Sequence, residues 1–262
     1  MTRRVQDLFD LGGRTALVTG GSRGLGLQIA HALGEAGARI MLSSRKAGDL
    51  EEATAELQAA GIDARWIAAD CSREDDIRKL ADQTLERMGD VDILVNNAGA
   101  AWGAPAEDHP VEGWDKVMNL NVRGYFILSQ HIAKRSMIPR KQGRIVNIAS
   151  IAGLGGNPPE LQMIAYNTSK GAVITFTQAL AGEWGRYGIN VNAICPGFFP
   201  SRMTRTTLEQ LGEQLARRAP LQRLGDDEDL KGTALLFASD AGKHITGQWL
   251  AVDGGVSVIT GG

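Results

Sequence analysis

A tyrosine and a lysine lie four residues apart in the segment Tyr166-Asn167-Thr168-Ser169-Lys170. If this segment is helical, Tyr166 and Lys170 share one face, with their Cβ atoms about 5–6 Å apart. An ammonium beside a phenol stabilises the phenolate and lowers the pKa of the tyrosine from its ordinary value of about 10. Such a tyrosine can donate or accept a proton near neutral pH. The same spacing also occurs in exposed helical pairs without chemistry, so its meaning depends on its neighbours.

Ser150 and Asn121 are polar residues that give this pair a chemical setting. Ser150 follows a β-rich run at residues 144–148. Its hydroxyl can hydrogen-bond a substrate carbonyl, although a lone serine there is more often a cap or turn residue. Asn121 lies in a helical stretch at residues 114–138, where asparagine is a poor helix former. We therefore expect Asn121 to make either a structural or a functional hydrogen bond.

A glycine-rich loop follows the first β-rich run, at residues 15–19, and opens a helical pattern. Its sequence is Thr19-Gly20-Gly21-Ser22-Arg23-Gly24-Leu25-Gly26. Backbone N–H groups at a helix start attract a pyrophosphate, and side chains there would block its approach. We expect Gly20 to allow the turn, Gly24 to allow the approach and Gly26 to let helix pack on strand. The spacing differs from GxGxxG, and a glycine-rich turn without a ligand is the alternative.

The second β-rich run, at residues 39–43, continues into Ser44, Arg45 and Lys46, and no acid follows until Asp49. At this position an acid favours NAD, whereas a basic residue accommodates the 2′-phosphate of NADP. Arg23, in the glycine loop, could reach the same phosphate. The sequence therefore predicts NADP(H) as the cofactor. The alternative is that Arg45 and Lys46 are solvated surface charges.

Two more strand ends carry candidate cofactor contacts. Asp70, with Cys71 beside it, directly follows a run at residues 65–69. It is placed either to accept a hydrogen bond from an adenine amino group or to cap the next helix. The segment Asn96-Asn97-Ala98-Gly99 follows a run at residues 92–95. It suits a tight turn over a ribose, with Asn97, Ala98 and Gly99 as contacts, or a side-chain clamp between strands.

Seven β-rich runs alternate with helical patterns along the chain. The runs lie at residues 15–19, 39–43, 65–69, 92–95, 144–148, 189–194 and 249–252, and the clearest helical patterns at 25–37, 48–60, 74–88 and 114–138. Such alternation predicts right-handed βαβ units and a parallel sheet. We expect an α/β fold, a single doubly wound (Rossmann) domain over residues 1–262, whose seven-stranded parallel sheet has helices on both faces. Its ligand should bind outside the carboxyl ends of the strands.

Composition excludes several other classes of protein. The chain has 262 residues, and 28 Lys and Arg against 30 Asp and Glu give a net charge of −2, which argues against a nucleic-acid binder. Cys71 and Cys195 stand in no CxxC or Cys/His cluster, so we expect neither a disulfide scaffold nor a metal site. No apolar run approaches the roughly 18 residues of a membrane span, and the charged N-terminus is unlike a signal peptide. We therefore expect a cytoplasmic protein without a membrane partner.

Taken together, these residues resemble the short-chain dehydrogenase/reductase family over nearly the full chain. The matching residues, in the family's order and at about its spacing, are Thr19, Gly20, Gly24, Gly26, Asp70, Asn96-Asn97-Ala98-Gly99, Asn121, Ser150, Tyr166, Lys170 and Pro196-Gly197. The resemblance implies that Tyr166 is the general acid/base and that Ser150 orients the carbonyl. Lys170 would bind the nicotinamide ribose and assist Tyr166, and Asn121 would hold a water in a proton relay.

The resemblance also implies surroundings for the reacting groups. Pro196, Gly197 and Phe199 would lie beside the nicotinamide. To lower the tyrosine pKa by about 2–3, the phenolate must be stabilised by roughly 3–4 kcal/mol relative to the phenol. The Lys170 ammonium together with an oxidised nicotinamide could supply this stabilisation.

Within the family, the chain resembles NADPH-dependent 3-oxoacyl-[acyl-carrier-protein] reductases, in the branch of the rhamnolipid-pathway ketoacyl reductase. The segments behind this resemblance are residues 97–104, 113–118 and 196–204. It implies hydride transfer between NADP(H) and a ketone or secondary alcohol, with a 3-oxoacyl thioester on acyl carrier protein or CoA as substrate. A sugar or polyol dehydrogenase, of gluconate- or glucose-dehydrogenase type, is the alternative. A non-catalytic NADP-binding regulator is a remote one.

Three segments bear on substrate and assembly. Residues 153–163 form a longer segment than is usual in the family, and their glycines and prolines predict an irregular loop on the substrate side. Residues 200–218 could form a helical lid over the substrate or an ordinary pair of surface helices. The segment at residues 245–255 resembles the family's subunit-contact edge, which implies a homotetramer.

Overall fold

One parallel sheet contains all seven strands, in the order β3-β2-β1-β4-β5-β6-β7. The computed structural model describes residues 2–259. The strands are β1 (Thr15–Thr19), β2 (Arg39–Ser44), β3 (Ala64–Ala68), β4 (Ile93–Asn96), β5 (Gly143–Ile148), β6 (Ile189–Pro196) and β7 (Trp249–Val252). The strand order reverses at β1, which pairs with β2 on one side and β4 on the other. The predicted doubly wound α/β fold is confirmed.

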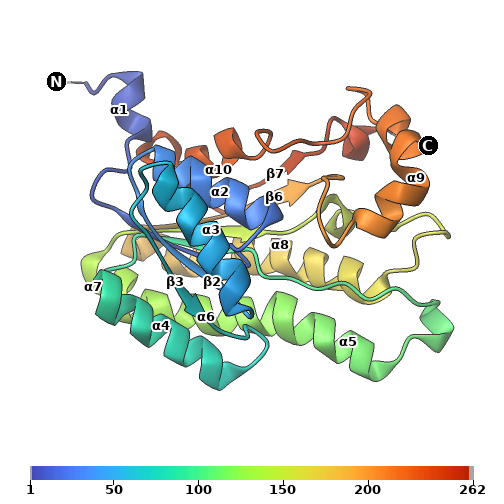
Figure 1. Cartoon of the computed structure of the whole chain (residues 1–262), viewed down its shortest axis with the longest axis horizontal. Helices are drawn as coiled ribbons and strands as arrows, with labels where there is room; N and C mark the ends of the chain where they lie inside the picture. The colour runs from blue at the N-terminus through green and yellow to red at the C-terminus, as the bar shows by residue number, and fades with distance from the viewer. Residues whose placement is uncertain (1, 260–262) are drawn as a thin grey trace.

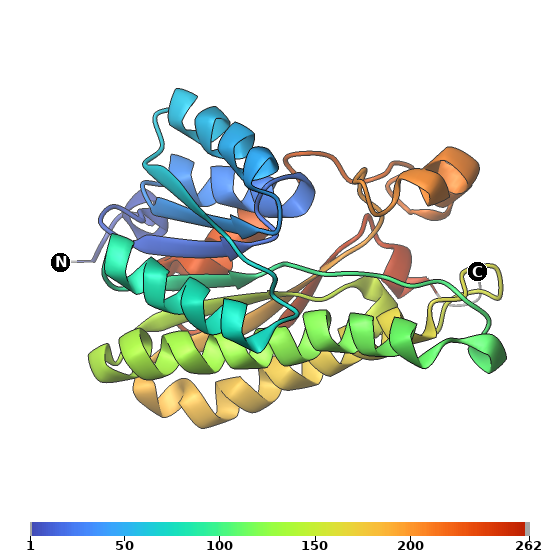
Figure 2. The same cartoon turned by 60° about the horizontal axis from the view of Figure 1, so that its bottom comes forward.

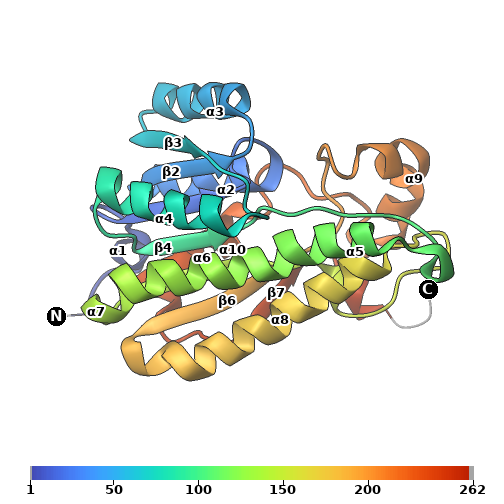
Figure 3. The same cartoon turned by 90° about the horizontal axis from the view of Figure 1, so that it is seen from below.

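Helices connect the strands and cover both faces of the sheet. They are α1 (Val5–Phe9), α2 (Gly24–Glu35), α3 (Ala47–Ala59), α4 (Glu74–Met88), α5 (Val111–Met118), α6 (Gly124–Ile132), α7 (Ile138–Arg140), α8 (Ile164–Trp184), α9 (Arg205–Arg218) and α10 (Lys231–Ala238). Helices α2, α3 and α10 lie on one face, and α4, α6 and α8 lie on the other (Figures 1 and 3). No helix within residues 2–259 is both long and apolar enough to cross a membrane.

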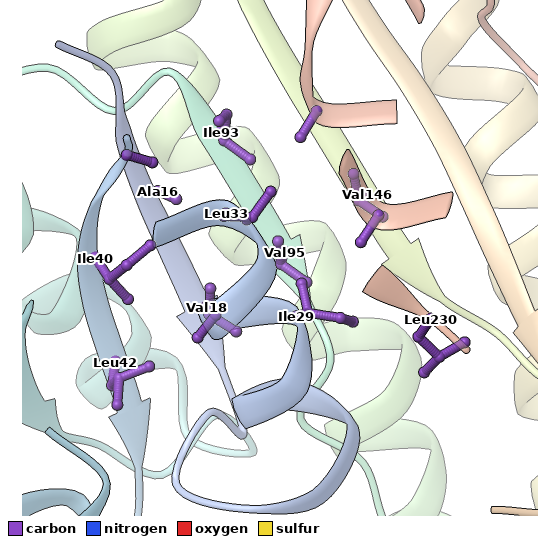
Figure 4. Close-up of a cluster of buried hydrophobic side chains, with 14 of the residues drawn as sticks. Ala16, Val18, Ile29, Leu33, Ile40, Leu42, Ile93, Val95, Val146 and Leu230 are labelled. Carbon is purple, nitrogen blue, oxygen red and sulfur yellow. The ribbon is translucent and has the colours of Figure 1, made fainter. Parts of the chain in front are cut away.

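Clusters of buried hydrophobic side chains on both faces fix the sheet between its helices. On the α2 face, Val18 of β1 and Ile40 of β2 are buried with Ile29 and Leu33 of α2 (Figure 4). Burial of such side chains contributes about 1.5–3 kcal/mol each. Because consecutive residues of a strand point to opposite faces, Leu17 belongs to the other core, against α4 and α6. This packing sets the position of every loop at the carboxyl edge.

A continuous helical run extends from α5 to α7 and includes two π-helical segments. These are η2 (Asn119–Arg123) and η3 (Ala133–Met137). The run confirms the helical stretch predicted at residues 114–138. Short π segments are frequent at functional sites, and η2 contains Asn121.

Helix α9 stands apart from the layered body of the molecule. It lies beyond the sheet, on the side of the loops that follow the strands (Figure 2). Of the two alternatives for residues 200–218, the pair of surface helices is wrong, because residues 200–204 contain no helix and α9 is a single helix. Residues 154–163, in contrast, form no regular element, as the glycines and prolines predict.

Candidate active site

A cleft of about 870 Å³ opens outside the carboxyl ends of the strands. Its wall comes from the loops after β1 to β6 and from the start of α9. Every residue predicted to bind the cofactor lines it: Gly20, Ser22, Arg23, Gly24, Leu25, Gly26, Ser44, Arg45, Lys46, Asp70, Cys71, Asn97, Ala98, Gly99, Tyr166, Lys170, Pro196, Gly197 and Phe199. Ser150 lines it as well, whereas Asn121 does not.

The glycine loop has the backbone that its sequence predicts. Gly20 and Gly24 adopt left-handed conformations, with φ of +62° and +53°, which side chains disfavour. A Cβ at Gly26 would collide with the Gly20 carbonyl oxygen and the Asn97 amide. Gly26 therefore packs against the loop and Asn97, rather than against a strand as the sequence suggests. The start of α2 is thereby held close to the end of β4.

Asn97 ties the glycine loop to the neighbouring strand end. Its side-chain nitrogen donates to the carbonyl oxygens of Thr19, at 2.9 Å, and of Gly20, at 3.1 Å. The Thr19 hydroxyl in turn accepts from the backbone N–H groups of Asn97 and Ala98. These bonds bear out the side-chain clamp, which was one of the two alternatives for the Asn96-Asn97-Ala98-Gly99 segment.

A buried polar network beneath the cleft joins β4, β5, α6 and α8. The side-chain nitrogen of Asn96 donates to the Asn147 side chain and to the Ser129 hydroxyl, both at 2.9 Å. The side-chain nitrogen of Asn147 donates to the Thr177 hydroxyl at 2.9 Å. All four residues are at most 1% exposed. Asn147 is not among the residues predicted from the sequence, although an asparagine inside a β-rich run is a usable signal.

Tyr166 and Lys170 lie on one face of α8, as the spacing predicts. The Lys170 Nζ is 5.6 Å from the centre of the Tyr166 ring. Its hydrogen bond, however, goes to the carbonyl oxygen of Ile148, at 2.7 Å. The Tyr125 hydroxyl donates to the same carbonyl at 3.4 Å, and its ring centre lies 5.8 Å from the ammonium. Tyr125 is not among the site residues predicted from the sequence.

Burial dominates the protonation of this pair. It lowers the pKa of the Lys170 ammonium to about 8 and raises the pKa of the Tyr166 phenol, an effect that the hydrogen bond with Ser150 opposes. A lowering of the Tyr166 pKa by Lys170 together with an oxidised nicotinamide stays a prediction, since burial raises this pKa in the protein alone and the ammonium donates to Ile148. In this state the phenol is a proton donor at neutral pH.

Ser150 and Asn121 are both held by backbone groups. Ser150 precedes the 3-10 helix η4 (Ile151–Gly153), and its hydroxyl oxygen accepts from the N–H of Ala152 at 3.1 Å. Asn121 is fully buried behind the cleft and brackets Ala100, accepting from its N–H at 2.8 Å and donating to its carbonyl at 2.9 Å. It also donates to the Ser169 hydroxyl. The expected structural hydrogen bond of Asn121 is thus present.

The basic residues in the loops after β1 and β2 differ in their surroundings. Arg23 forms an ion pair with Asp49 at 2.6 Å, at the rim of the cleft. Arg45 and Lys46 form no ion pair within residues 2–259. The hydroxyl of Ser44 is buried and has no hydrogen-bond partner among the described residues. Among the described residues, this rim therefore has two side-chain cations without an ion-pair partner, Arg45 and Lys46, and one hydroxyl without a hydrogen-bond partner, that of Ser44.

Asp70 does not cap the helix that follows it, since α4 begins after Arg73 without a side-chain cap. One carboxylate oxygen of Asp70 instead accepts from the backbone N–H of Ser72 at 3.0 Å and from its hydroxyl at 2.7 Å. The capping alternative is wrong, and the carboxylate stays at the cleft wall.

The loop at residues 154–163 is fastened to the first turn of α8. The side-chain nitrogen of Asn157 donates to the side chain of Asn167 at 2.9 Å, and that of Asn167 donates to the carbonyl of Gly155 at 3.1 Å. Asn167 follows Tyr166 directly, so the loop is anchored beside the reacting pair without contacting it through these bonds.

Comparisons with known proteins agree with this arrangement. The family model described as short chain dehydrogenase matches residues 14–212. The chain is 42% identical over 252 residues to the rhamnolipids biosynthesis 3-oxoacyl-[acyl-carrier-protein] reductase of Pseudomonas aeruginosa, covering 94% of this chain and 97% of that one. It is 39% identical over 254 residues to the gluconate 5-dehydrogenase of Gluconobacter oxydans, covering 96% and 98%.

Solved structures extend the similarity to the fold. A gluconate 5-dehydrogenase from Burkholderia cenocepacia, in complex with NADP and tartrate, superposes with a TM-score of 0.92 at 34% identity, covering 98% of this chain and 100% of that one. On the extent of these matches, the chain belongs to the short-chain dehydrogenase/reductase family.

Proposed function

We propose that this chain is an NADP(H)-dependent oxidoreductase that interconverts a ketone and a secondary alcohol, and that it reduces a 3-oxoacyl thioester in fatty-acid metabolism. The observation that carries the proposal is the meeting of Tyr166, Lys170 and Ser150 with the glycine loop in one cleft. A sugar-acid or polyol dehydrogenase is the second candidate, supported by the 39% identity to a gluconate 5-dehydrogenase.

The cleft fits a dinucleotide that carries a 2′-phosphate. The glycine loop opens α2 with left-handed backbone at Gly20 and Gly24, so N–H groups can face a pyrophosphate without side chains in the way. Where we expect the ribose with the 2′-phosphate to lie, Arg45 and Lys46 provide positive charge, and the buried Ser44 hydroxyl can donate a hydrogen bond. The NADP named for the Burkholderia cenocepacia enzyme supports the same cofactor here.

The chain's own residues account for proton transfer and orientation. When bound, the nicotinamide supplies or accepts the hydride. The hydroxyl of Ser150 donates to the substrate carbonyl oxygen, and the phenol of Tyr166 gives that oxygen its proton. Lys170, held by Ile148, binds the nicotinamide ribose and keeps positive charge behind the phenol. Pro196, Gly197 and Phe199 close the cleft beside the nicotinamide.

Two further roles follow from the positions of Asn121 and Asp70. Asn121 fixes the backbone of Ala100, and its carbonyl oxygen retains a lone pair for a water in a proton relay. Asp70, with Cys71 beside it, accepts from the adenine amino group through its second carboxylate oxygen, because Ser72 occupies the first.

The experiment that tests this proposal assays a panel of substrates and measures turnover by the change in NADPH absorbance. Purified enzyme is given acetoacetyl-CoA, a 3-oxoacyl-acyl carrier protein, 5-ketogluconate and, in the oxidative direction, gluconate and polyols. We expect the highest kcat/KM with a 3-oxoacyl thioester and NADPH. Preference for a sugar acid establishes the second candidate, and no turnover of any carbonyl with either cofactor refutes both.

Assembly, lid and location complete the proposal. We expect the segment at residues 200–218 to cover bound substrate, because its first residues already line the cleft.

We also expect a homotetramer, because β7 is the last strand of the sheet and its Trp249 and Leu250 are 43% and 44% exposed. Light scattering of the purified protein tests this. The free, buried cysteines Cys71 and Cys195 suit the reducing cytoplasm.

A further inference from the structure

Two arginines stand on the wall of the cleft that the start of α9 provides. Arg202 and Arg205 line the cleft together with Ser150 and Tyr166, and both are exposed. In the part of the chain that the structure describes, neither forms an ion pair, although nearby Arg217 and Arg223 do. They are not needed for the fold, because they neither pack in a core nor bridge two elements.

The segment that carries these arginines is fixed rather than loosely placed. The Thr204 hydroxyl donates to the Phe199 carbonyl at 2.6 Å, and the Thr204 N–H donates to the Ser201 hydroxyl at 3.2 Å. Ser201 also lies against the glycine loop, since the Cβ of Ser201 is 3.8 Å from the position that a Cβ on Gly24 would take. Arg202 and Arg205 are therefore held at the mouth of the cleft.

Charge on this wall is not balanced from within the protein. The acidic residues that line the cleft are Asp70, whose carboxylate binds Ser72, and Asp227, whose carboxylate accepts from Gln28 at 2.7 Å. The first turn of α9 carries no acid. In a chain with a net charge of −2, two uncompensated cations beside a reacting site favour an anionic ligand.

These two arginines stand in a different segment of the chain from the cations that are expected to bind the cofactor phosphate. Arg23, Arg45 and Lys46 already supply cations after β1 and β2, near the predicted 2′-phosphate. Arg202 and Arg205 instead come shortly after Phe199 in the chain, a residue that we expect to lie beside the nicotinamide.

We propose that Arg202 and Arg205 bind an anionic group of the substrate, a phosphate or a carboxylate, that is carried beyond the reacting carbonyl. The proposal rests on the proposed function and specifies its substrate class. A CoA or carrier thioester provides the anion as a phosphate, and an aldonate provides it as a carboxylate. A guanidinium can bind either with two parallel hydrogen bonds.

The first test compares charged and neutral substrates. The double variant Arg202→Gln/Arg205→Gln is assayed with acetoacetyl-CoA against the uncharged acetoacetyl-N-acetylcysteamine, and with 5-ketogluconate against fructose. We expect the ratio of kcat/KM for charged over neutral substrate to fall by about tenfold or more in one pair, through KM. The affected pair identifies phosphate or carboxylate as the anion. Arg186→Gln, which changes an exposed arginine that follows α8 and lies outside both the cleft and the segment at residues 200–218, is the matched control and should leave both ratios unchanged.

The second test needs no turnover and separates this inference from the proposed function. Calorimetry at saturating NADPH measures binding of CoA and of gluconate to wild type, to the double variant and to Arg186→Gln. We expect one of the two anions to bind wild type and Arg186→Gln, and to bind the double variant at least about tenfold more weakly. Equal binding to all three proteins, or no binding of either anion, overturns the inference. A tenfold weaker dissociation constant for NADPH itself in the double variant also overturns it, since the arginines then serve the cofactor.

Discussion

The ammonium of Lys170 donates to the main-chain carbonyl of Ile148, 2.7 Å away, at the end of β5. Ser150 lies two residues further along the same segment. One hydrogen bond therefore joins the helix that carries Tyr166 to the strand that carries the hydroxyl of Ser150. The relative position of phenol and hydroxyl is set by the sheet, and α8 cannot slide along β5 without breaking this bond.

Replacement of Tyr166 tests the proton donor directly. We expect Tyr166→Phe to lower kcat by about 10²–10⁴-fold, because the variant keeps the ring and loses only the hydroxyl. NADPH binding, followed by fluorescence titration, should change little. A variant that turns over at a near-native rate would show that the proton comes from elsewhere.

Lys170 makes a prediction for stability as a function of pH. Its pKa in the folded protein is about 8, against 10.5 for an unperturbed lysine. Between these values the unfolded chain binds more protons than the folded one, so the Lys170 contribution to stability rises with pH. From pH 7 to 9.5, urea unfolding should show wild type gaining about 1–2 kcal/mol relative to Lys170→Met.

The comparison with Lys170→Met removes the effects of the other titrating groups, including buried tyrosines and cysteines common to both proteins. Parallel stability curves for the two proteins over this range would mean that Lys170 is not desolvated in the folded state.

Arg45 should discriminate between the two nicotinamide cofactors. We expect Arg45→Ala to weaken NADPH binding by about tenfold, because a charge-assisted contact to the 2′-phosphate is lost, and to leave NADH binding nearly unchanged. Fluorescence titration of wild type and variant with both cofactors measures this. If wild type binds NADPH and NADH equally, the predicted cofactor preference is wrong.

Asp49 should oppose NADPH binding, since its carboxylate holds the Arg23 guanidinium at 2.6 Å. We expect Asp49→Asn to tighten NADPH binding by about two- to fivefold, the range of an exposed ion pair, and to leave NADH binding unchanged. Glu52→Gln, on an exposed position of the same helix, is the control. Weaker NADPH binding by Asp49→Asn would mean that Asp49 orients Arg23 rather than competing for it.

Asn147 should stabilise the fold as well as the site. Its loss leaves the Thr177 hydroxyl without its side-chain donor and removes one of the two acceptors of the Asn96 side chain. We expect Asn147→Ala to lower the free energy of unfolding by about 2–3 kcal/mol. The control is Asn157→Ala, which removes hydrogen bonds from a partly exposed loop and should cost about 0.5 kcal/mol. Equal effects of the two substitutions would contradict a special role of the buried network.

The sequence predicts the strands and the cleft because both depend on local patterns. Apolar β-rich runs of four to six residues alternate with helical patterns, and the polar residues directly after them meet at one edge. The glycines at positions 20 and 24 require backbone that only glycine adopts readily, so their conformation could also be predicted.

What could not be predicted depends on contacts between distant segments. The partner of Lys170 is a backbone oxygen, which carries no signature in the sequence, and the balance between burial and charge at Tyr166 needs coordinates. Likewise, the ion pair of Arg23 with Asp49 joins residues from different elements. Arg202 and Arg205 could not be singled out in the sequence, because exposed arginines are common. Only their position on the cleft wall distinguishes them from other surface arginines.

The fastening of the loop at residues 154–163 to Asn167 has a practical consequence. Since these bonds join residues of one short stretch of chain, the loop can be exchanged as a unit next to the proton donor. The corresponding loop of another family member can replace it, with Asn157 and Asn167 retained so that their hydrogen bonds still form. Such an exchange offers a way to change the range of substrates without changing the residues that transfer the proton.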